Sequence, residues 1–161
     1  MKTLYLLRHA KSDWSDPSLD DFSRPLNRRG KRARTVIARH VVGWQVDLVV
    51  CSPAQRARAT AKPVIDALEC PVRYDDAMYG ARADDLFALT RSLPERVSSV
   101  MLVGHNPSTE EFTALLCGLS ASYPTAALGT LELAVEHWQD VAPGCASLTA
   151  LVTPAQLSSD P

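Results

Sequence analysis

Short apolar runs along the chain indicate buried β-strands. Four of them lie at residues 3–7, 46–51, 70–74 and 97–103. They are too short for helices and show little alternation with polar residues, which is typical of strands buried on both faces of a parallel sheet. Two further runs, at residues 127–135 and 145–152, are expected to form a hairpin across a turn at residues 140–144.

Between these runs, apolar residues recur every three or four positions, as on the buried face of an amphipathic helix. Helices are predicted from Asn27, after Ser52, from Ala83 and after Asn106. The opposite face of the first helix is strongly basic and carries Arg28, Arg29, Lys31, Arg32, Arg34 and Arg39. Such a face is either solvated or a docking patch for an acidic partner, and the pattern leaves both interpretations open.

Two of the predicted strands lead directly into helix start signals. After the second strand, Ser52 can cap a helix, Pro53 suits its first position and Gln55 completes a capping box. After the fourth strand, Asn106 is a favoured cap and Pro107 suits the first turn. Free amide groups of both helices are therefore expected beside strand ends, where they favour an anion.

Strands that alternate with helices predict an α/β fold. We expect a three-layer domain in which helices cover both faces of a mostly parallel central sheet and the last hairpin is antiparallel. The 161 residues have the length of one domain, which we assign to residues 1–153. Residues 154–161 are expected to form a short polar tail that is frayed.

Composition narrows the function classes. Hydrophobic residues make up 46% and charged residues 22% of the chain, and the formal net charge is -1. A chain so close to neutral has no general field for nucleic acid or an anionic membrane, so any anion site must be local. No apolar run has the length of a membrane span or a signal peptide. The scattered cysteines indicate free thiols in a reducing cytoplasm; they are Cys51, Cys70, Cys117 and Cys145.

Charged side chains stand where three predicted strands end. Arg8 and His9 follow the first strand, Arg56 lies shortly after the second, and His105 follows the fourth. Each alone has an ordinary structural explanation, but open parallel sheets bind ligands outside the carboxyl ends of their strands, so we expect the four side chains to converge. Guanidinium groups, imidazoles and helix amides together suit a compact dianion such as phosphate.

Three segments resemble, in order and spacing, the signatures of the histidine phosphatase superfamily. They are residues 7–12 (LRHAKS), residues 52–57 (SPAQRA) with Thr60, and residues 103–107 (VGHNP). The resemblance also includes Arg24-Pro25-Leu26 and Gly30, and it covers essentially the whole chain. Ala10 replaces the glycine that usually follows Arg-His in the phosphoglycerate mutase branch, so the sequence is most similar to the small phosphohistidine phosphatase branch, the SixA type.

This resemblance implies a phosphoglycerate mutase-like fold and a covalent intermediate. His9 would be the nucleophile that attacks phosphorus as a neutral imidazole, forming a phosphohistidine that water hydrolyses. The residues implied to hold the phosphoryl group are Arg8, Ser12, Arg56, His105 and Asn106. The arginines would stabilise the charge of the transition state, so no metal or other cofactor is expected.

A proton donor for the leaving group is less clearly marked. Asp76 resembles in position the acidic residue of the mutase branch, although Asp75 is adjacent and an exposed loop carboxylate is an equally ordinary explanation. A phosphoramidate needs less acid assistance than an ester, so a missing donor would favour phosphohistidine as substrate. Ser15 replaces a typical asparagine of the mutase branch and lid insertions are lacking, so mutase activity is not expected.

The sequence thus predicts a metal-independent phosphatase whose preferred substrate is phosphohistidine on a partner protein. An open site without a lid suits a phosphoryl group displayed on a protein surface. Two alternatives stay open, namely a phosphatase for a small phosphorylated metabolite and a non-catalytic module that binds a phosphorylated protein. Neither the physiological partner nor the oligomeric state follows from the sequence.

Overall fold

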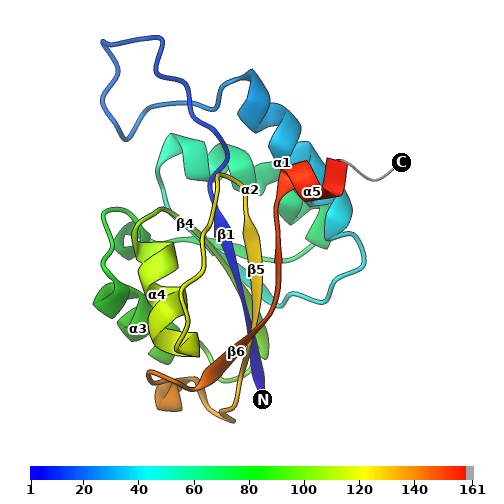
Figure 1. The fold of residues 1–161 in the computed structure, drawn as a ribbon, viewed down its shortest axis with the longest axis vertical. Coiled ribbons are helices and arrows are strands. Elements are labelled where there is room, and N and C mark those ends of the chain that lie inside the picture. Colours follow the sequence, from blue (N-terminus) through cyan, green and yellow to red (C-terminus); the bar gives the residue numbers. More distant parts are fainter. Residues whose placement is uncertain (159–161) are drawn as a thin grey trace.

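The computed structural model describes residues 1–158 and has a six-stranded sheet at its centre (Figure 1). The strands are β1 (Lys2–Arg8), β2 (Leu48–Cys51), β3 (Val72–Tyr74), β4 (Ser99–Gly104), β5 (Leu128–Leu133) and β6 (Ala146–Val152). Their spatial order is β3-β2-β4-β1-β5-β6. Strands β1 to β4 pair in parallel, whereas β5 is antiparallel to both β1 and β6. The predicted mixed α/β fold is confirmed.

Helices cover both faces of this sheet. They are α1 (Arg28–His40), α2 (Gln55–Leu68), α3 (Ala83–Arg91), α4 (Ser108–Cys117) and α5 (Pro154–Ser158), with short 3-10 turns at Asp76–Met78 and Trp138–Asp140. Helices α3 and α4 pack on one face, and α1 and α2 on the other (Figure 1). Within residues 1–158, no helix is both long and apolar enough to cross a membrane.

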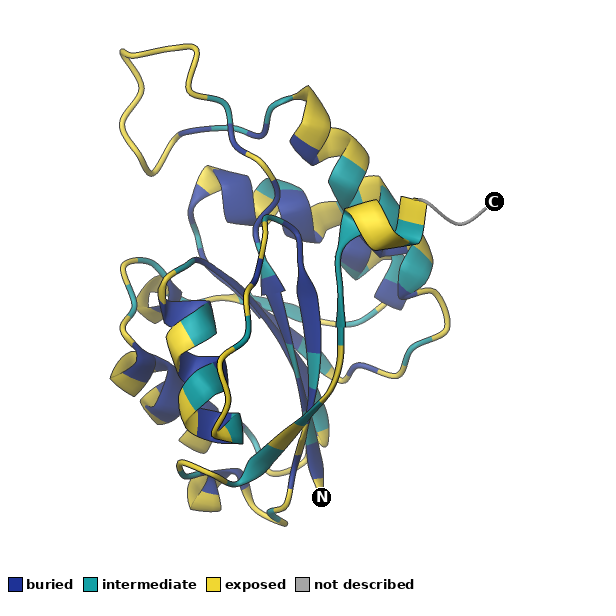
Figure 2. Ribbon diagram, viewed as in Figure 1, coloured by how far each residue is buried: buried dark blue, intermediate teal, exposed yellow. Residues whose placement is uncertain are grey.

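The alternation of side chains along the inner strands divides the core into two layers. Leu6 and Leu102 belong to the cluster under α3 and α4, whereas their chain neighbours Leu7 and Val103 belong to the cluster under α1 and α2. This is the two-residue period of a strand, with both faces apolar because both are covered. Figure 2 shows the result, a buried centre with exposure concentrated on the outer faces of helices and on the loop between β1 and α1.

Strand register brings the ends of three strands to one place. Arg8 of β1 pairs with Gly104 of β4, and Cys51 of β2 pairs with Val103 of β4. Backbone bonds continue this register one residue further, because the amide of His9 donates to the Gly104 carbonyl at 3.0 Å. The residues that directly follow β1, β2 and β4 are therefore neighbours in space.

The predicted capping of two helices is wrong. Helix α2 begins at Gln55 without a side-chain cap, and the Ser52 hydroxyl instead accepts from the Ala54 amide and bonds to the ring of His105. Helix α4 begins at Ser108, and the side-chain amide of Asn106 donates to the Tyr123 backbone carbonyl at 3.1 Å. Both polar side chains form tertiary hydrogen bonds near the strand ends instead of capping a helix. Local sequence patterns do not predict such long-range contacts.

The carboxyl-terminal segment also differs from the predicted polar tail. Residues Pro154–Ser158 form α5, which packs against α1, and Leu157 joins the apolar cluster beneath α1 and α2. One apolar side chain therefore anchors a helix too short to be predicted from its periodicity. The remainder of the predicted tail, residues 159–161, lies outside the described residues.

Helix α1 makes a close backbone contact with the segment that follows His9. Gly30 packs against the backbone of Lys11, whose carbonyl oxygen also accepts a bond from the Asn27 amide at 3.0 Å. A Cβ atom at Gly30 would overlap that carbonyl oxygen. The absence of a side chain here thus sets how closely α1 approaches the candidate site.

We expect Gly30→Ala to destabilise the protein, because overpacking against backbone costs about 1–3 kcal/mol. This cost outweighs the gain of roughly 0.5–1 kcal/mol from replacing glycine within a helix. Urea unfolding would measure the change, with Arg32→Ala on the exposed face of α1 as the matched control. A Gly30→Ala protein as stable as the wild type would show that α1 shifts freely.

Candidate active site

A cavity of about 340 Å³ lies where β1, β2 and β4 end. Its walls come from residues after these strands and from the loop between β1 and α1. They are Arg8, His9, Lys11, Ser12, Trp14, Arg24, Arg56, His105, Asn106 and Thr125. The structure thus brings together all the residues that the sequence assigned to the nucleophile and the phosphoryl group, from positions almost one hundred residues apart.

The two aspartates considered as proton donors lie elsewhere. Asp76 is exposed in the 3-10 turn that follows β3 and is not among the residues lining the cavity. Asp75 accepts from the Ala77 amide at 2.9 Å and lies 3.5 Å from Arg73, so it caps the turn. A donor role for Asp76 therefore stays a prediction, without support from its placement.

His9 is buried, with 8% of its surface exposed, and its ring is fixed by the backbone. Nδ1 lies 2.7 Å from the Ala10 carbonyl oxygen, which can only accept, so Nδ1 carries the proton and Nε2 holds a free electron pair. The Ala10 amide in turn donates to the Thr60 hydroxyl at 2.9 Å. Burial, followed by the nearby positive groups, lowers the pKa of His9 to about 3 despite the Ala10 bond. His9 is therefore a neutral imidazole with the tautomer required of a nucleophile.

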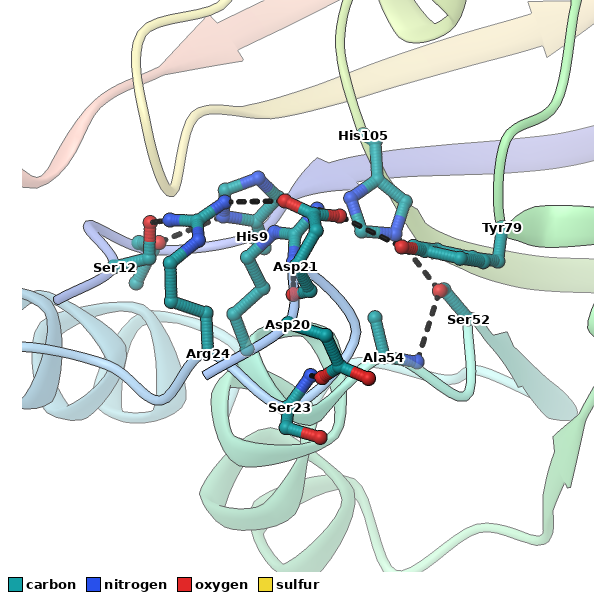
Figure 3. Close-up of polar contacts among 12 residues, drawn as sticks. His9, Ser12, Asp20, Asp21, Ser23, Arg24, Ser52, Ala54, Tyr79 and His105 are labelled. Atoms are coloured by element: carbon teal, nitrogen blue, oxygen red, sulfur yellow. Dashed lines mark hydrogen bonds and ion pairs between the residues drawn. The ribbon is translucent and has the colours of Figure 1, made fainter. Parts of the chain in front are cut away.

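His105 faces His9 with their ring centroids 5.1 Å apart (Figure 3). Its Nε2 lies 2.8 Å from the Ser52 hydroxyl, and its Nδ1 is buried without a hydrogen-bond partner. Burial, and then the charge of Arg56, lower the pKa of His105 to about 4. When Ser52 donates to Nε2, the proton of the neutral ring resides on Nδ1, which makes His105 a hydrogen-bond donor without charge.

Asp21 links the positive groups of the site and was not predicted as a site residue. Its carboxylate lies 2.8 Å from Arg24 and 3.0 Å from Arg56, and accepts from the Tyr79 hydroxyl at 2.7 Å (Figure 3). Its backbone carbonyl accepts a further bond from Arg56. The hydrogen bonds from Arg24 and Tyr79 hold the pKa of Asp21 far below its usual range. Asp21 thus orients both arginines and is a poor proton donor in this arrangement.

Arg24 is a further residue that sequence reasoning did not assign to the site, as are the cavity-lining residues Lys11, Trp14 and Thr125. Arg24 is 7% exposed, it donates to Ser12, and the Trp14 ring covers its guanidinium group. The available signals were the resemblance around Arg24-Pro25-Leu26 and the length of the polar loop, since long loops in compact domains are usually functional. The loop is fastened to α2, because the Gln55 amide donates to the Phe22 carbonyl.

Several buried donors around the cavity have no partner within the protein. They are Nε of Arg8, Nε of Arg24, Nε of Arg56 and Nδ1 of His105. Native proteins rarely leave buried polar groups unsatisfied. An acceptor of the same cavity, Oδ1 of Asn106, and a donor outside it, Nε of Arg73, are also buried without a partner. The guanidinium groups of three arginines and the imidazole of His105 line the same cavity as His9. This concentration of positive charge and N–H donors suits an anion with several oxygens. The arrangement can therefore bind a phosphoryl group and attack it.

A larger groove of about 540 Å³ lies beside α2, but it lacks this chemistry. It is lined by Arg34, Gln55, Arg58, Ala59, Lys62, Ile65, Asp66, Val72 and Tyr74. None of these side chains is a nucleophile next to a positioned donor, so the smaller cavity is the candidate active site. Among residues 1–158, no group of three or more His, Cys, Asp or Glu side chains is arranged to hold a metal ion.

Comparisons with known proteins agree with this geometry. The sequence profile of the Histidine phosphatase superfamily (branch 1) matches residues 4–92. Uncharacterized protein Rv1276c of Mycobacterium tuberculosis (strain ATCC 25618 / H37Rv) is 34% identical over 166 residues, which cover 92% of this chain and 99% of that protein.

Two solved structures are similar over nearly their whole length. One is a proposed phosphohistidine phosphatase SixA from Agrobacterium tumefaciens, with a TM-score of 0.82, 32% identity and coverage of 95% of this chain and 98% of that chain. The other is a proposed phosphohistidine phosphatase SixA from Nakamurella multipartitia, with a TM-score of 0.82, 29% identity and coverage of 95% and 96%.

We expect His9 and His105 to stay neutral as the pH is lowered from 7 to 5. Their folded pKa values of about 3 and about 4 lie below the roughly 6.5 of unfolded histidine. The unfolded state therefore binds more protons in this range, and their contribution to stability is lost as the pH falls. Histidine-selective NMR would follow both rings, with His9→Ala and His105→Gln providing the assignments. A midpoint near 6.5 for either ring would contradict the expectation.

Proposed function

The chain belongs to the histidine phosphatase superfamily, branch 1, and is of the SixA type; from that premise we propose that it dephosphorylates phosphohistidine on a partner protein. One observation carries the proposal, the cavity in which three arginines and His105 surround a neutral His9 whose Nε2 is free. These positive groups would hold the oxygens of a phosphoryl group and leave its phosphorus open to the nucleophile.

The reaction follows from the placement of these groups. The electron pair of His9 Nε2 attacks phosphorus in line, the bond from phosphorus to the substrate nitrogen breaks, and the leaving imidazole takes a proton from solvent. Arg8, Arg56 and His105 stabilise the charge on the phosphoryl oxygens, and Arg24 adds a fourth donor. Water then attacks the phosphorylated His9, which releases inorganic phosphate and returns the electron pair to Nε2.

The chemistry of the leaving group supports phosphohistidine over a phosphate ester. Within the described residues, no carboxyl group is among those lining the cavity, and the nearby Asp21 is held ionised by hydrogen bonds from Arg24 and Tyr79 and then by Arg56. An alkoxide leaving group would require an acid. The ring of a phosphohistidine can instead take up a proton from solvent on its second nitrogen, with a pKa of about 6.5 for an ordinary histidine ring, and then leaves as neutral imidazole. The two structurally similar proteins with SixA names are proposed phosphohistidine phosphatases, which supports the same substrate class.

We further propose the cytoplasm as the compartment. The four cysteines are free thiols, and Cys51 is fully buried beside the site. Free thiols of this kind persist in a reducing environment. Proteins that carry phosphohistidine in the same compartment would be its partners.

Rapid-quench trapping with a radiolabelled phosphohistidine protein tests the proposal directly. We expect acid-labile, base-stable label on the wild type and none on His9→Ala, because only His9 supplies the nucleophile. If kcat/KM for small phosphate esters is much higher than for the phosphohistidine protein, the substrate is a small phosphorylated metabolite instead. Binding of the phosphoprotein without turnover would make the protein a recognition module.

Replacement of Arg56 tests the anion site separately from the nucleophile. We expect Arg56→Ala to cost about 2.7–4 kcal/mol in the transition state, or roughly 100- to 1,000-fold in kcat, as for loss of one preorganised donor. Arg58→Ala, two residues along α2 and exposed, is the matched control and should retain wild-type kcat. Equal kcat values for the two variants would remove Arg56 from the reaction.

A further inference from the structure

Trp14 is an aromatic ring in an unusual position at the rim of the candidate active site. It is 71% exposed, yet it lines the cavity beside Ser12 and Arg24. One face of the ring is covered, since the Arg24 guanidinium carbon lies 3.6 Å from its centroid. Because so much of Trp14 is exposed, the face of the ring away from Arg24 is open to solvent.

The platform formed by Trp14 and Arg24 is held in place on several sides. Arg24 is buried and bonded to both Ser12 and Asp21, so it offers a fixed surface to the ring. The Asp13 amide donates to the Pro25 carbonyl at 2.8 Å, which closes the base of the loop next to Trp14. An exposed ring that is already oriented loses little conformational freedom when a second ring stacks on it.

We infer that Trp14 is a specificity-determining residue whose free face stacks on the planar ring that carries the phosphoryl group. The inference rests on the proposed function, because the ring in question is the imidazole of a phosphohistidine. Trp14 lines the same cavity as Arg56 and His105, so a phosphoryl group held at those two residues would carry its substituent in the cavity that Trp14 borders. Stacking on an aromatic face favours a planar imidazole over a flexible alkyl group, which has no ring to stack.

Two small substrates with the same type of scissile bond test this inference. Phosphoimidazole carries the ring, and phosphoramidate has a phosphorus–nitrogen bond without a ring. We expect Trp14→Ala to lower kcat/KM for phosphoimidazole about three- to tenfold more than for phosphoramidate, the range typical of an aromatic pair. Trp14→Phe should retain most of the difference between the two substrates. Leu19→Ala, at an exposed position of the same loop that does not line the cavity, is the matched control.

The outcomes separate this inference from the proposed function. If Trp14→Ala lowers kcat/KM equally for both compounds, Trp14 only supports Arg24 and the stacking role is overturned while the proposed function stands. If the wild type hydrolyses neither compound nor a phosphohistidine protein, the proposed function fails and the inference fails with it. Unchanged inhibition of Trp14→Ala by inorganic phosphate would show that the phosphoryl site itself is intact, as the stacking role requires.

Discussion

The parallel register of β1, β4 and β2 is the constraint on which the site depends. Pairing of Arg8 with Gly104 and of Cys51 with Val103 places the residues after each strand side by side. A shift of one residue in β1 would exchange the side chains that pack in the two layers of the core. The packing of both layers therefore fixes the register of β1. The position of His9 relative to His105 is therefore protected by the packing of the whole sheet.

Electrostatics at the site balance two opposing demands. An anion site needs positive charge, whereas a nucleophilic imidazole must stay unprotonated. Burial and neighbouring guanidinium groups meet both demands together, since each disfavours a proton on His9. Asp21 restrains the excess charge by binding Arg24 and Arg56, while each of these arginines keeps its Nε donor free. The permanently charged arginines thus keep His9 neutral and nucleophilic, so its reactivity does not depend on a group that titrates near neutral pH.

Sequence patterns predicted the strands, most helices and the convergence at the strand ends, because burial on both faces leaves a clear apolar signal. They did not predict how polar side chains are shared between elements. Ser52 and Asn106 have the chemistry of helix caps, but tertiary contacts recruit them instead. The positions of Asp21, Arg24 and Trp14 depend on an irregular loop whose path is set by long-range bonds, and irregular loops carry no periodicity. Helix α5 was missed because five residues are too few for a pattern.

The Ala10 carbonyl oxygen that fixes the tautomer of His9 belongs to the main chain. No side-chain substitution can remove this acceptor, so the tautomer of His9 does not depend on which side chains surround it. The rim, by contrast, is made of loop side chains that can change one at a time. Substitutions at the rim can therefore change which substrate binds without changing the protonation state of His9. Substrate specificity is the property of this site that evolution can alter most easily.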